Sequence, residues 1–181
     1  MNIKHKKQQN KSLLLLVFVT IFLVSCNNTN SGKNLKSNDT IGVNLEIPVY
    51  NFSEFEPLLY TKSDKTYLIN FWAMWCAPCV KELPYIEQFA AKHPDVEVIL
   101  VSLDFPKDIE TKLKPFLKEK NINSKVILLD DPDSNTWIDK IDPNWSGAIP
   151  FTIMFNNKKR LFYERSFENL KDLENQIKKL N

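Results

Sequence analysis

The feature that most constrains this chain is a pair of cysteines, Cys76 and Cys79, at the junction of two sequence patterns. The residues before the pair, 66–72 (TYLINFW), are rich in β-branched and aromatic side chains and predict a strand. Residues 77–92 carry apolar side chains at helical spacing and predict a helix that ends at His93-Pro94. We therefore expect the cysteines where a strand runs directly into a helix.

The remaining sequence continues this alternation of strands and helices. The run 96–103 (VEVILVSL) is almost wholly apolar, as expected for a strand buried on both faces of a sheet. Further strands are expected at 126–129, 151–155 and 160–163, and helices over 108–120 (kinked or split by Pro115), around Trp137 and Ile141, and from Phe167 with Ser166 as its cap. The pattern predicts an α/β fold with a central mixed sheet flanked by helices.

The first 26 residues differ from the rest and predict an export signal. Four lysines and no acid precede an apolar run, Leu13–Val24, that is interrupted only by Thr20. As a helix this run reaches roughly 18 Å, too short for a hydrocarbon core of about 30 Å. A basic start followed by a short apolar run is typical of a signal peptide.

The end of this run, Leu23–Cys26, resembles the bacterial lipobox, in which the cysteine is lipidated. The alternative is an uncleaved anchor or an ordinary signal with a chance cysteine at this position. Residues 27–40 are polar and without apolar periodicity, and we interpret them as a flexible tether. The predicted organisation is a signal over 1–26, a tether over 27–40 and one domain over 41–181, held at the membrane through Cys26 and exposed outside the cytoplasm.

Charge gives no indication of a nucleic-acid partner. The chain has a formal net charge of +2, but without the four lysines of residues 1–26 it has 20 basic and 22 acidic side chains. The basic run 158–160 (KKR) is interpreted as a solvated hairpin turn. No basic surface is therefore predicted.

The types and spacing of its potential ligands argue against a metal site at the cysteine pair. A closed zinc site needs about four ligands, and beyond the signal the chain offers Cys76, Cys79 and His93. A structural disulfide is possible in an exported protein, although it would close too short a loop to constrain the unfolded chain. The pattern favours a redox pair.

The position of the pair explains why redox chemistry suits it. At a helix N-terminus, unpaired N–H groups and the helix dipole favour a thiolate on Cys76, and the thiolate is the nucleophile of disulfide exchange. Pro78 fits the first helical turn, where a missing N–H costs nothing. Cys79 lies about one turn further on, close enough to attack a mixed disulfide on Cys76.

These residues, Phe71-Trp72-Ala73-x-Trp75-Cys76-Ala77-Pro78-Cys79, resemble the active-site signature of the thioredoxin superfamily. With Glu82-Leu83-Pro84 they are more similar to its membrane-anchored TlpA/ResA-type branch. The resemblance covers about residues 41–181 and implies a cis-proline at Pro150, in Gly147-Ala148-Ile149-Pro150-Phe151. It also implies an extra strand–helix insertion before that proline.

The resemblance further implies roles for the residues around the pair. Backbone groups of Ile149 would bind a substrate segment, and Trp75 would cover the nucleophile or touch substrate. Asn70 occupies a position where many thioredoxins carry an acid that moves the proton of the resolving thiol. Glu82 is a candidate substitute, and a solvated helix glutamate is the alternative. Trp72 and Trp145 are expected to be core or rim residues.

The resemblance implies thiol–disulfide exchange with exported proteins and no cofactor beyond the cysteine pair. Ala77-Pro78 is more similar to reducing members of the superfamily, which favours a reductase, with cytochrome c maturation as one context and a transmembrane electron donor of the DsbD/CcdA kind. A disulfide oxidase or isomerase is the alternative. A thiol peroxidase is disfavoured because Ala73 stands where peroxiredoxins have Thr-x-x-Cys. A metal carrier is disfavoured because no histidine follows His93.

Overall fold

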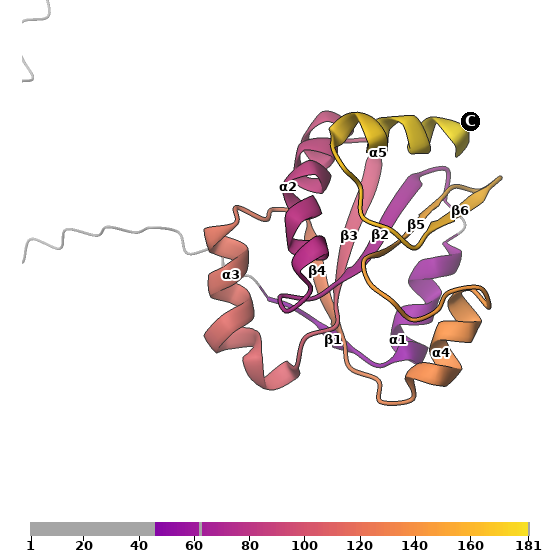
Figure 1. Ribbon diagram of the computed structural model, residues 1–181. Helices are drawn as coiled ribbons and strands as arrows, with labels where there is room; N and C mark the ends of the chain where they lie inside the picture. Colours follow the sequence, from indigo (N-terminus) through magenta and orange to yellow (C-terminus); the bar gives the residue numbers. More distant parts are fainter. Residues whose placement is uncertain (1–45, 62, 181) are drawn as a thin grey trace, which may run out of the picture. The chain divides into compact units, whose positions relative to one another are not determined.

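A computed structural model describes residues 46–61 and 63–180 (Figure 1). Six strands form one sheet in the order β1-β4-β3-β2-β5-β6. Strands β1, β4, β3 and β2 run parallel, whereas β5 is antiparallel to both β2 and β6. The strands are Val49–Tyr50 (β1), Thr66–Trp72 (β2), Val96–Ser102 (β3), Lys125–Leu129 (β4), Phe151–Phe155 (β5) and Arg160–Tyr163 (β6).

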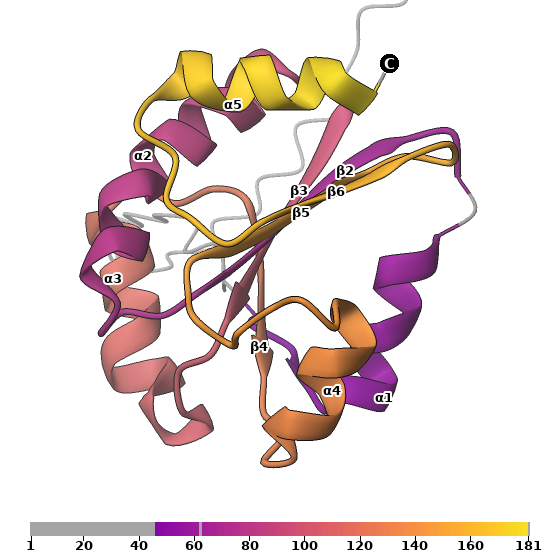
Figure 2. The same cartoon turned by 45° about the vertical axis from the view of Figure 1, so that its right-hand side comes forward.

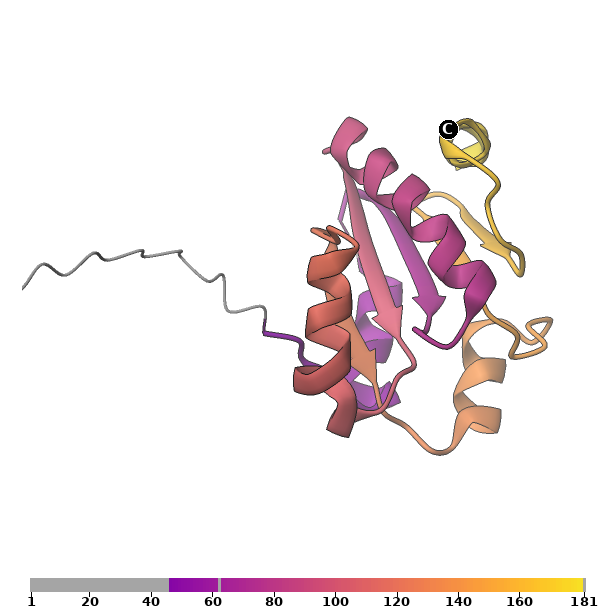
Figure 3. The same ribbon diagram turned by 60° about the vertical axis from the view of Figure 1, so that its left-hand side comes forward.

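Helices cover both faces of the sheet (Figure 2). Helices α2, α3 and α5 lie on one face, and α1 and α4 lie on the other; Figure 3 shows α2 and α3 in front of the strands. The α-helices are Phe52–Phe55 (α1), Ala77–Lys92 (α2), Lys114–Glu119 (α3), Ser134–Ile141 (α4) and Leu170–Ile177 (α5). Short 3₁₀ segments follow α1 (Glu56–Tyr60), precede α3 (Pro106–Asp108) and end the chain (Lys178–Leu180), and a π-helical turn covers Ile109–Leu113.

The two central strands are buried on both faces, as their apolar sequences require. In β2, every residue from Tyr67 to Trp72 is buried, and successive side chains alternate between two separate hydrophobic clusters. Leu68 and Trp72 pack beneath α2 and α3, whereas Ile69 and Phe71 pack against α1 and α4. Burial on both faces is the normal state of a parallel strand between helix layers.

The segment 108–120, expected to be one helix broken by Pro115, begins with a 3₁₀ turn and a π-helical turn. Regular α-helix begins at Lys114, with Pro115 in the first turn of α3. A proline at that position removes an N–H that has no partner inside the helix. Pro115 therefore stands at the start of the regular α-helix. The residues before it in the helical segment, 106–113, form 3₁₀ and π-helical turns instead of α-helix.

The predicted start of the last helix is wrong. We expected it at Phe167 with Ser166 as cap, but α5 begins at Leu170, and the side chain of Asn169 accepts the N–H of Asp172 as its cap. Both Ser and Asn are good N-cap residues, so the local sequence does not choose between them. The Ser166 hydroxyl instead donates to Pro78 and Glu82 of α2.

The prediction for the basic run 158–160 is partly wrong. Lys158 and Lys159 are exposed, but Arg160 is half-buried in β6. Its guanidinium stacks on the rings of Phe155 and Tyr60 and donates to the backbone oxygen of Leu59. Arg160 therefore packs the hairpin against the segment after α1.

The fold class is confirmed: the chain has a thioredoxin-like α/β fold in which β4 and α4 stand between β3 and the cis-proline before β5. The predicted signal over 1–26, Cys26 and the tether over 27–40 lie outside the described residues. None of the helices in residues 46–61 and 63–180 is long and apolar enough to span a membrane.

Candidate active site

Strand directions bring the motif residues to one edge of the sheet. Trp72, the last residue of β2, pairs with Ser102 at the end of the parallel strand β3. Because β5 runs antiparallel to β2, its first residue, Phe151, pairs with Phe71 near the same edge. The segment after β2 therefore meets the segment before β5, although about 75 residues separate them in sequence.

The two cysteines form a disulfide at the start of α2. The S–S distance is 1.99 Å, and Cys76 is the N-cap residue of the helix. Cys76 Sγ accepts the backbone N–H of Cys79 at 3.3 Å, so the sulfur already receives one of the free N–H groups at the helix end. Cys76 is 6% exposed and Cys79 is fully buried. The outer sulfur is thus Cys76, in the electrostatic setting that favours a thiolate.

The loop before β5 lies directly against the outer sulfur. The Ile149–Pro150 peptide bond is cis, and the backbone oxygen of Ile149 lies 3.6 Å from Cys76 Sγ. The indole N–H of Trp145 donates to the oxygen of Ala148 at 2.8 Å. Gly147 adopts φ +87°, a conformation that side chains with a Cβ rarely adopt. The loop is therefore folded on itself and presents backbone groups beside the disulfide.

A buried polar cluster around Glu82 lies between α2 and the face of the sheet that this helix covers. Glu82, one turn after Cys79, has no exposed surface. One of its carboxylate oxygens accepts the Asn70 side-chain N–H at 2.9 Å, and the same amide nitrogen donates to Thr152 Oγ at 2.9 Å. Asn70 and Thr152 are paired neighbours on β2 and β5. Residues of two paired strands thus hold this carboxylate in place by hydrogen bonds.

The segment before α5 supplies two further hydrogen-bond donors to Glu82. The other oxygen of Glu82 accepts the backbone N–H of Phe167 at 2.7 Å and the hydroxyl of Ser166 at 3.2 Å. The Ser166 hydroxyl also lies 3.1 Å from the backbone oxygen of Pro78. Arg165 holds this segment through paired bonds to Asp172 at 2.7 and 2.9 Å, which lower the pKa of Asp172 to about 2.

Burial raises the pKa of Glu82 to about 7, against the opposing effect of its hydrogen bonds to Phe167, Asn70 and Ser166. Because Glu82 has no exposed surface, the alternative that it is a solvated helix glutamate is wrong. A carboxyl that titrates near neutral pH can take up or release a proton under ordinary conditions. An amide such as Asn70 cannot, so Glu82 is the titratable group of this cluster.

The aromatic residues of the motif divide between core and surface. Trp72 is fully buried and stacks on Phe116 of α3, and Trp145 is 4% exposed and stacks on Phe151. Both lie in the core, as predicted. Trp75, directly before Cys76, is 65% exposed, so its side chain lies largely in solvent.

Comparison with known proteins agrees with this geometry. Residues 44–164 match the AhpC/TSA family. The chain belongs to the AhpC/TSA family. With its thioredoxin-like fold and the Cys76–Cys79 pair, this AhpC/TSA protein is a thiol-disulfide oxidoreductase.

Its curated relatives include two proteins named for disulfide chemistry. The thiol:disulfide interchange protein DsbE of Haemophilus influenzae is 30% identical over 135 residues, which are 71% of this chain and 72% of DsbE. The thiol-disulfide oxidoreductase ResA of Oceanobacillus iheyensis is 29% identical over 117 residues, 56% of this chain and 57% of ResA. The AhpC/TSA protein is thus of the DsbE/ResA type.

Solved structures share the fold. A thioredoxin-related protein from Neisseria meningitidis is 25% identical with a TM-score of 0.54, covering 65% of this chain and 86% of its own. A DsbF homologue from Corynebacterium diphtheriae is 24% identical with a TM-score of 0.53, covering 66% and 74%. Both support the thioredoxin-like architecture of this AhpC/TSA protein.

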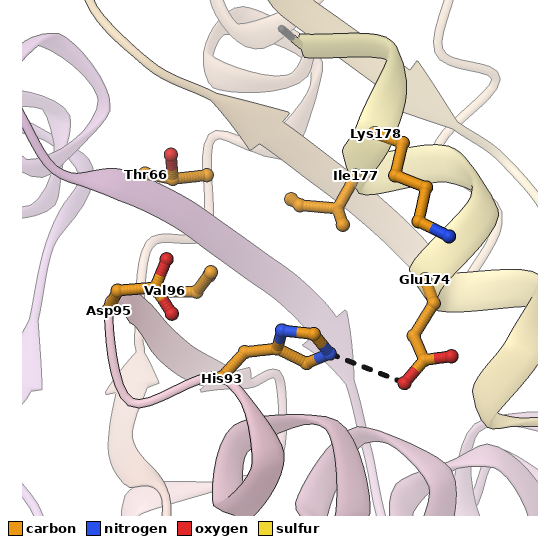
Figure 4. Close-up of a pocket in the computed structure, with 7 residues that line it drawn as sticks. All are labelled: Thr66, His93, Asp95, Val96, Glu174, Ile177 and Lys178. Carbon is orange, nitrogen blue, oxygen red and sulfur yellow. Dashed lines mark hydrogen bonds and ion pairs between the residues drawn. The ribbon is translucent and has the colours of Figure 1, made fainter.

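The AhpC/TSA protein also has a cavity that lies away from the disulfide. A cavity of about 380 Å³ opens at the other end of β2 and β3, lined by Thr66 and Val96 at the strand starts (Figure 4). His93 and Glu174 point toward one another across it at 3.3 Å. The cavity contains neither cysteine. Among the residues that the structure describes, no cluster of three or more His, Cys, Asp or Glu side chains is arranged to hold a metal ion.

Sequence reasoning missed three side chains that contact this site: Thr152, Ser166 and Asp104. Thr152 and Ser166 reach Glu82 or its partner Asn70 from more than 80 residues away. Asp104 accepts the backbone N–H of Met74 in the turn before Cys76. A polar residue in an otherwise apolar strand, as Thr152 is in FTIMF, was the one available signal for the first of them.

Proposed function

We propose that the protein is a lipid-anchored reductase that breaks disulfides in exported proteins through Cys76 and Cys79. The Cys76 thiolate attacks a client disulfide, forms a mixed disulfide and expels one client sulfur as a thiolate. Cys79 then attacks Cys76 Sγ, closes the internal disulfide and releases the second client sulfur. Two electrons pass from the enzyme dithiol to the client, which leaves as a dithiol.

The observation that carries this proposal is the asymmetry of the two sulfurs. Cys76 is the outer one, at the N-terminus of α2, with the backbone of Ile149 beside it. Cys79 is fully buried and bonded to Cys76. Attack by Cys76 on an outside disulfide, followed by resolution from Cys79, follows from this order.

Glu82 supplies the proton chemistry for the resolving step in this proposal. Cys79 must lose a proton before it can attack, and a base with a pKa of about 7 suits that transfer near neutral pH. Glu82 lies one helical turn beyond Cys79 on the buried face of α2. Asn70 and Thr152 hold the carboxylate by hydrogen bonds and carry no titratable proton.

Client binding is assigned to the backbone of Ile149, next to cis-Pro150, and to the exposed ring of Trp75. An extended client segment pairs with free backbone groups as an added strand would, which places its disulfide over Cys76. Pro78 has a conformational role, since it occupies the first turn of α2. No cofactor beyond the disulfide is needed for this exchange.

The names DsbE and ResA of the relatives, the lipobox at Cys26 and the signal-like start support a place in the bacterial cell envelope, with the domain outside the cytoplasm. There the enzyme needs re-reduction, for which a transmembrane thiol donor of the DsbD/CcdA kind is the class of partner required. Exported proteins with unwanted disulfides, including apocytochrome c, are the proposed clients.

Measurement of the reduction potential of the Cys76–Cys79 pair tests the direction. A value near thioredoxin's, about −270 mV, is expected for a reductase. A value near DsbA's, about −120 mV, would overturn the direction and favour an oxidase. Turnover of hydrogen peroxide by the same purified protein would instead point to a thiol peroxidase.

A further inference from the structure

Two loops meet at the edge of the sheet that carries the disulfide. Past the last paired residues of β2 and β3, the backbone N–H of Leu103 donates to the oxygen of Trp72 at 2.8 Å. One residue further on, the Asp104 carboxylate accepts the backbone N–H of Met74, at 3.1 and 3.2 Å to its two oxygens. Asp104 thus extends the contact between the two strands into the segment before Cys76.

Asp104 is a buried carboxylate without a cationic partner. It is 5% exposed, and no salt bridge found among residues 46–61 and 63–180 includes it. Ser102 supports it: the serine hydroxyl donates to one carboxylate oxygen at 2.8 Å and accepts the Asp104 N–H at 3.1 Å. Burial and the neighbouring charge of Asp108 raise the pKa of Asp104. Burial of a carboxylate costs free energy, which the hydrogen bonds from Met74 and Ser102 offset.

The backbone that Asp104 holds leads directly to the outer sulfur. Met74 is the second residue of a turn that the Cys76 N–H closes by donating to the oxygen of Ala73 at 3.1 Å. Cys76 then caps α2, where its sulfur receives the N–H of Cys79. A displacement of Met74 would therefore move Cys76 relative to the helix end and to Ile149.

We propose that Asp104 is a positioning residue of the redox site: it fixes Met74 and, through the Ala73–Cys76 turn, the position of Cys76 Sγ. The role rests on the proposed function of Cys76 as the attacking sulfur, and goes beyond it by naming the group that aims that sulfur. Asp104 touches no reacting atom. It acts through one charge-assisted hydrogen bond to the backbone.

The test compares Asp104→Ala with Asp104→Asn in the reduced enzyme, with the bimolecular rate toward a model disulfide as readout. Alanine removes the acceptor, so the rate should fall about tenfold, the effect of one lost hydrogen bond to a charged group. Asparagine keeps an oxygen for Met74 and an amide for Ser102, and should stay within about threefold of wild type. Amide hydrogen exchange at Met74 should be fast in the alanine variant and slow in the asparagine variant.

Asp131→Ala is the matched control. Like Asp104, Asp131 accepts backbone hydrogen bonds, in its case from the N–H groups of Phe52 and Asp133 at 3.0 Å each, but these residues belong to α1 and the turn before α4. This variant should lose stability and keep the wild-type rate of Cys76. If Asp104→Ala does not fold, Ser102→Ala leaves the carboxylate without its hydroxyl donor and should slow the reaction by about twofold to threefold.

The outcomes separate this inference from the proposed function. A reactive wild type with an equally reactive, folded Asp104→Ala variant would overturn the positioning role alone. Equal slowing in the alanine and asparagine variants would also overturn it, because the oxygen acceptor that asparagine keeps for Met74 would then make no difference to the rate. A wild-type protein that reacts with no disulfide would overturn both proposals.

Discussion

The two faces of the sheet differ in chemistry although they share the same strands. In β2, Asn70 and Phe71 are adjacent and both fully buried, but they point to opposite faces. The face under α2 carries the polar cluster around Glu82, whereas the face under α1 and α4 is built from aromatic rings. The aromatic contacts join Phe52, Phe55, Phe71, Trp137, Trp145 and Phe151 at ring-centroid distances of 4.0 to 6.5 Å.

This difference indicates that the aromatic face contributes mainly to stability and that the face with Glu82 contributes a titratable group. Burying aromatic rings stabilises the fold and keeps the sheet rigid. Burying Glu82 does the opposite above neutral pH, since the charged form is disfavoured in the interior. The helix with the cysteines packs over the second kind of face. Both faces carry a buried hydrophobic cluster, but only the face under α2 also holds the buried carboxyl group of Glu82.

Phe71→Ala is expected to have the largest effect, and on stability. The ring is fully buried and contacts four other aromatic rings, so its loss should lower the free energy of unfolding by about 3–5 kcal/mol. Urea unfolding measures the loss, with Phe71→Leu as a milder control. The pH dependence due to Glu82 should be unchanged; a variant that shifted it would contradict the separation of the faces.

Glu82→Gln should remove a pH dependence of stability. The folded-state pKa of about 7 lies above the ordinary 4.5, so between these values the folded state binds more protons than the unfolded state. The contribution of Glu82 to the stability of the oxidised wild type should therefore be fully present below pH 4.5 and fall by about 3 kcal/mol as the pH rises through 7.

Urea unfolding across this pH range checks the prediction, with the glutamine variant expected to lose that slope. The same variant should slow the resolving step at neutral pH, since glutamine takes up no proton. A wild type whose stability rose between pH 4.5 and 7 would show that the carboxyl is ionised at little cost, contrary to its burial.

Thr152→Val should have the smallest effect, about 1 kcal/mol, because it removes one hydrogen bond from Asn70 and conserves shape. A less firmly held Asn70 should donate less well to Glu82 and move the pH midpoint of stability upward. Ile153→Val is the control on the same strand and the opposite face, with a similar stability loss and an unmoved midpoint. Equal midpoints in both variants would contradict the role of the threonine.

The sequence predicted what depends on local pattern. Strand and helix periods located β2, α2, β3 and the closing hairpin within a few residues, because burial on one or two faces leaves a regular apolar spacing. The cysteine pair and its place at the strand–helix junction followed from the same signals. The α/β fold class was predictable for this reason, and the thioredoxin-like architecture followed from the resemblance of residues 71–79 to the signature of that superfamily.

What the sequence did not reveal depends on distant contacts. The burial of Glu82 results from donors at Ser166 and Phe167, more than 80 residues away. The same contact withdraws Ser166 from capping α5 and leaves that role to Asn169. From the sequence, Asp104 is predicted only to be a loop residue. Its contact with Met74 depends on the register of β2 and β3, which the sequence does not give. These sites were fixed by tertiary structure alone.

Trapping of a mixed disulfide tests the central claim most directly. Reduced Cys79→Ser and Cys76→Ser variants are mixed with a disulfide-bonded model protein, and the products are weighed by mass spectrometry without reductant. The Cys79→Ser variant should accumulate a covalent complex through Cys76, and the Cys76→Ser variant should give almost none. A complex formed through Cys79 instead, or no complex with either variant, would contradict the account.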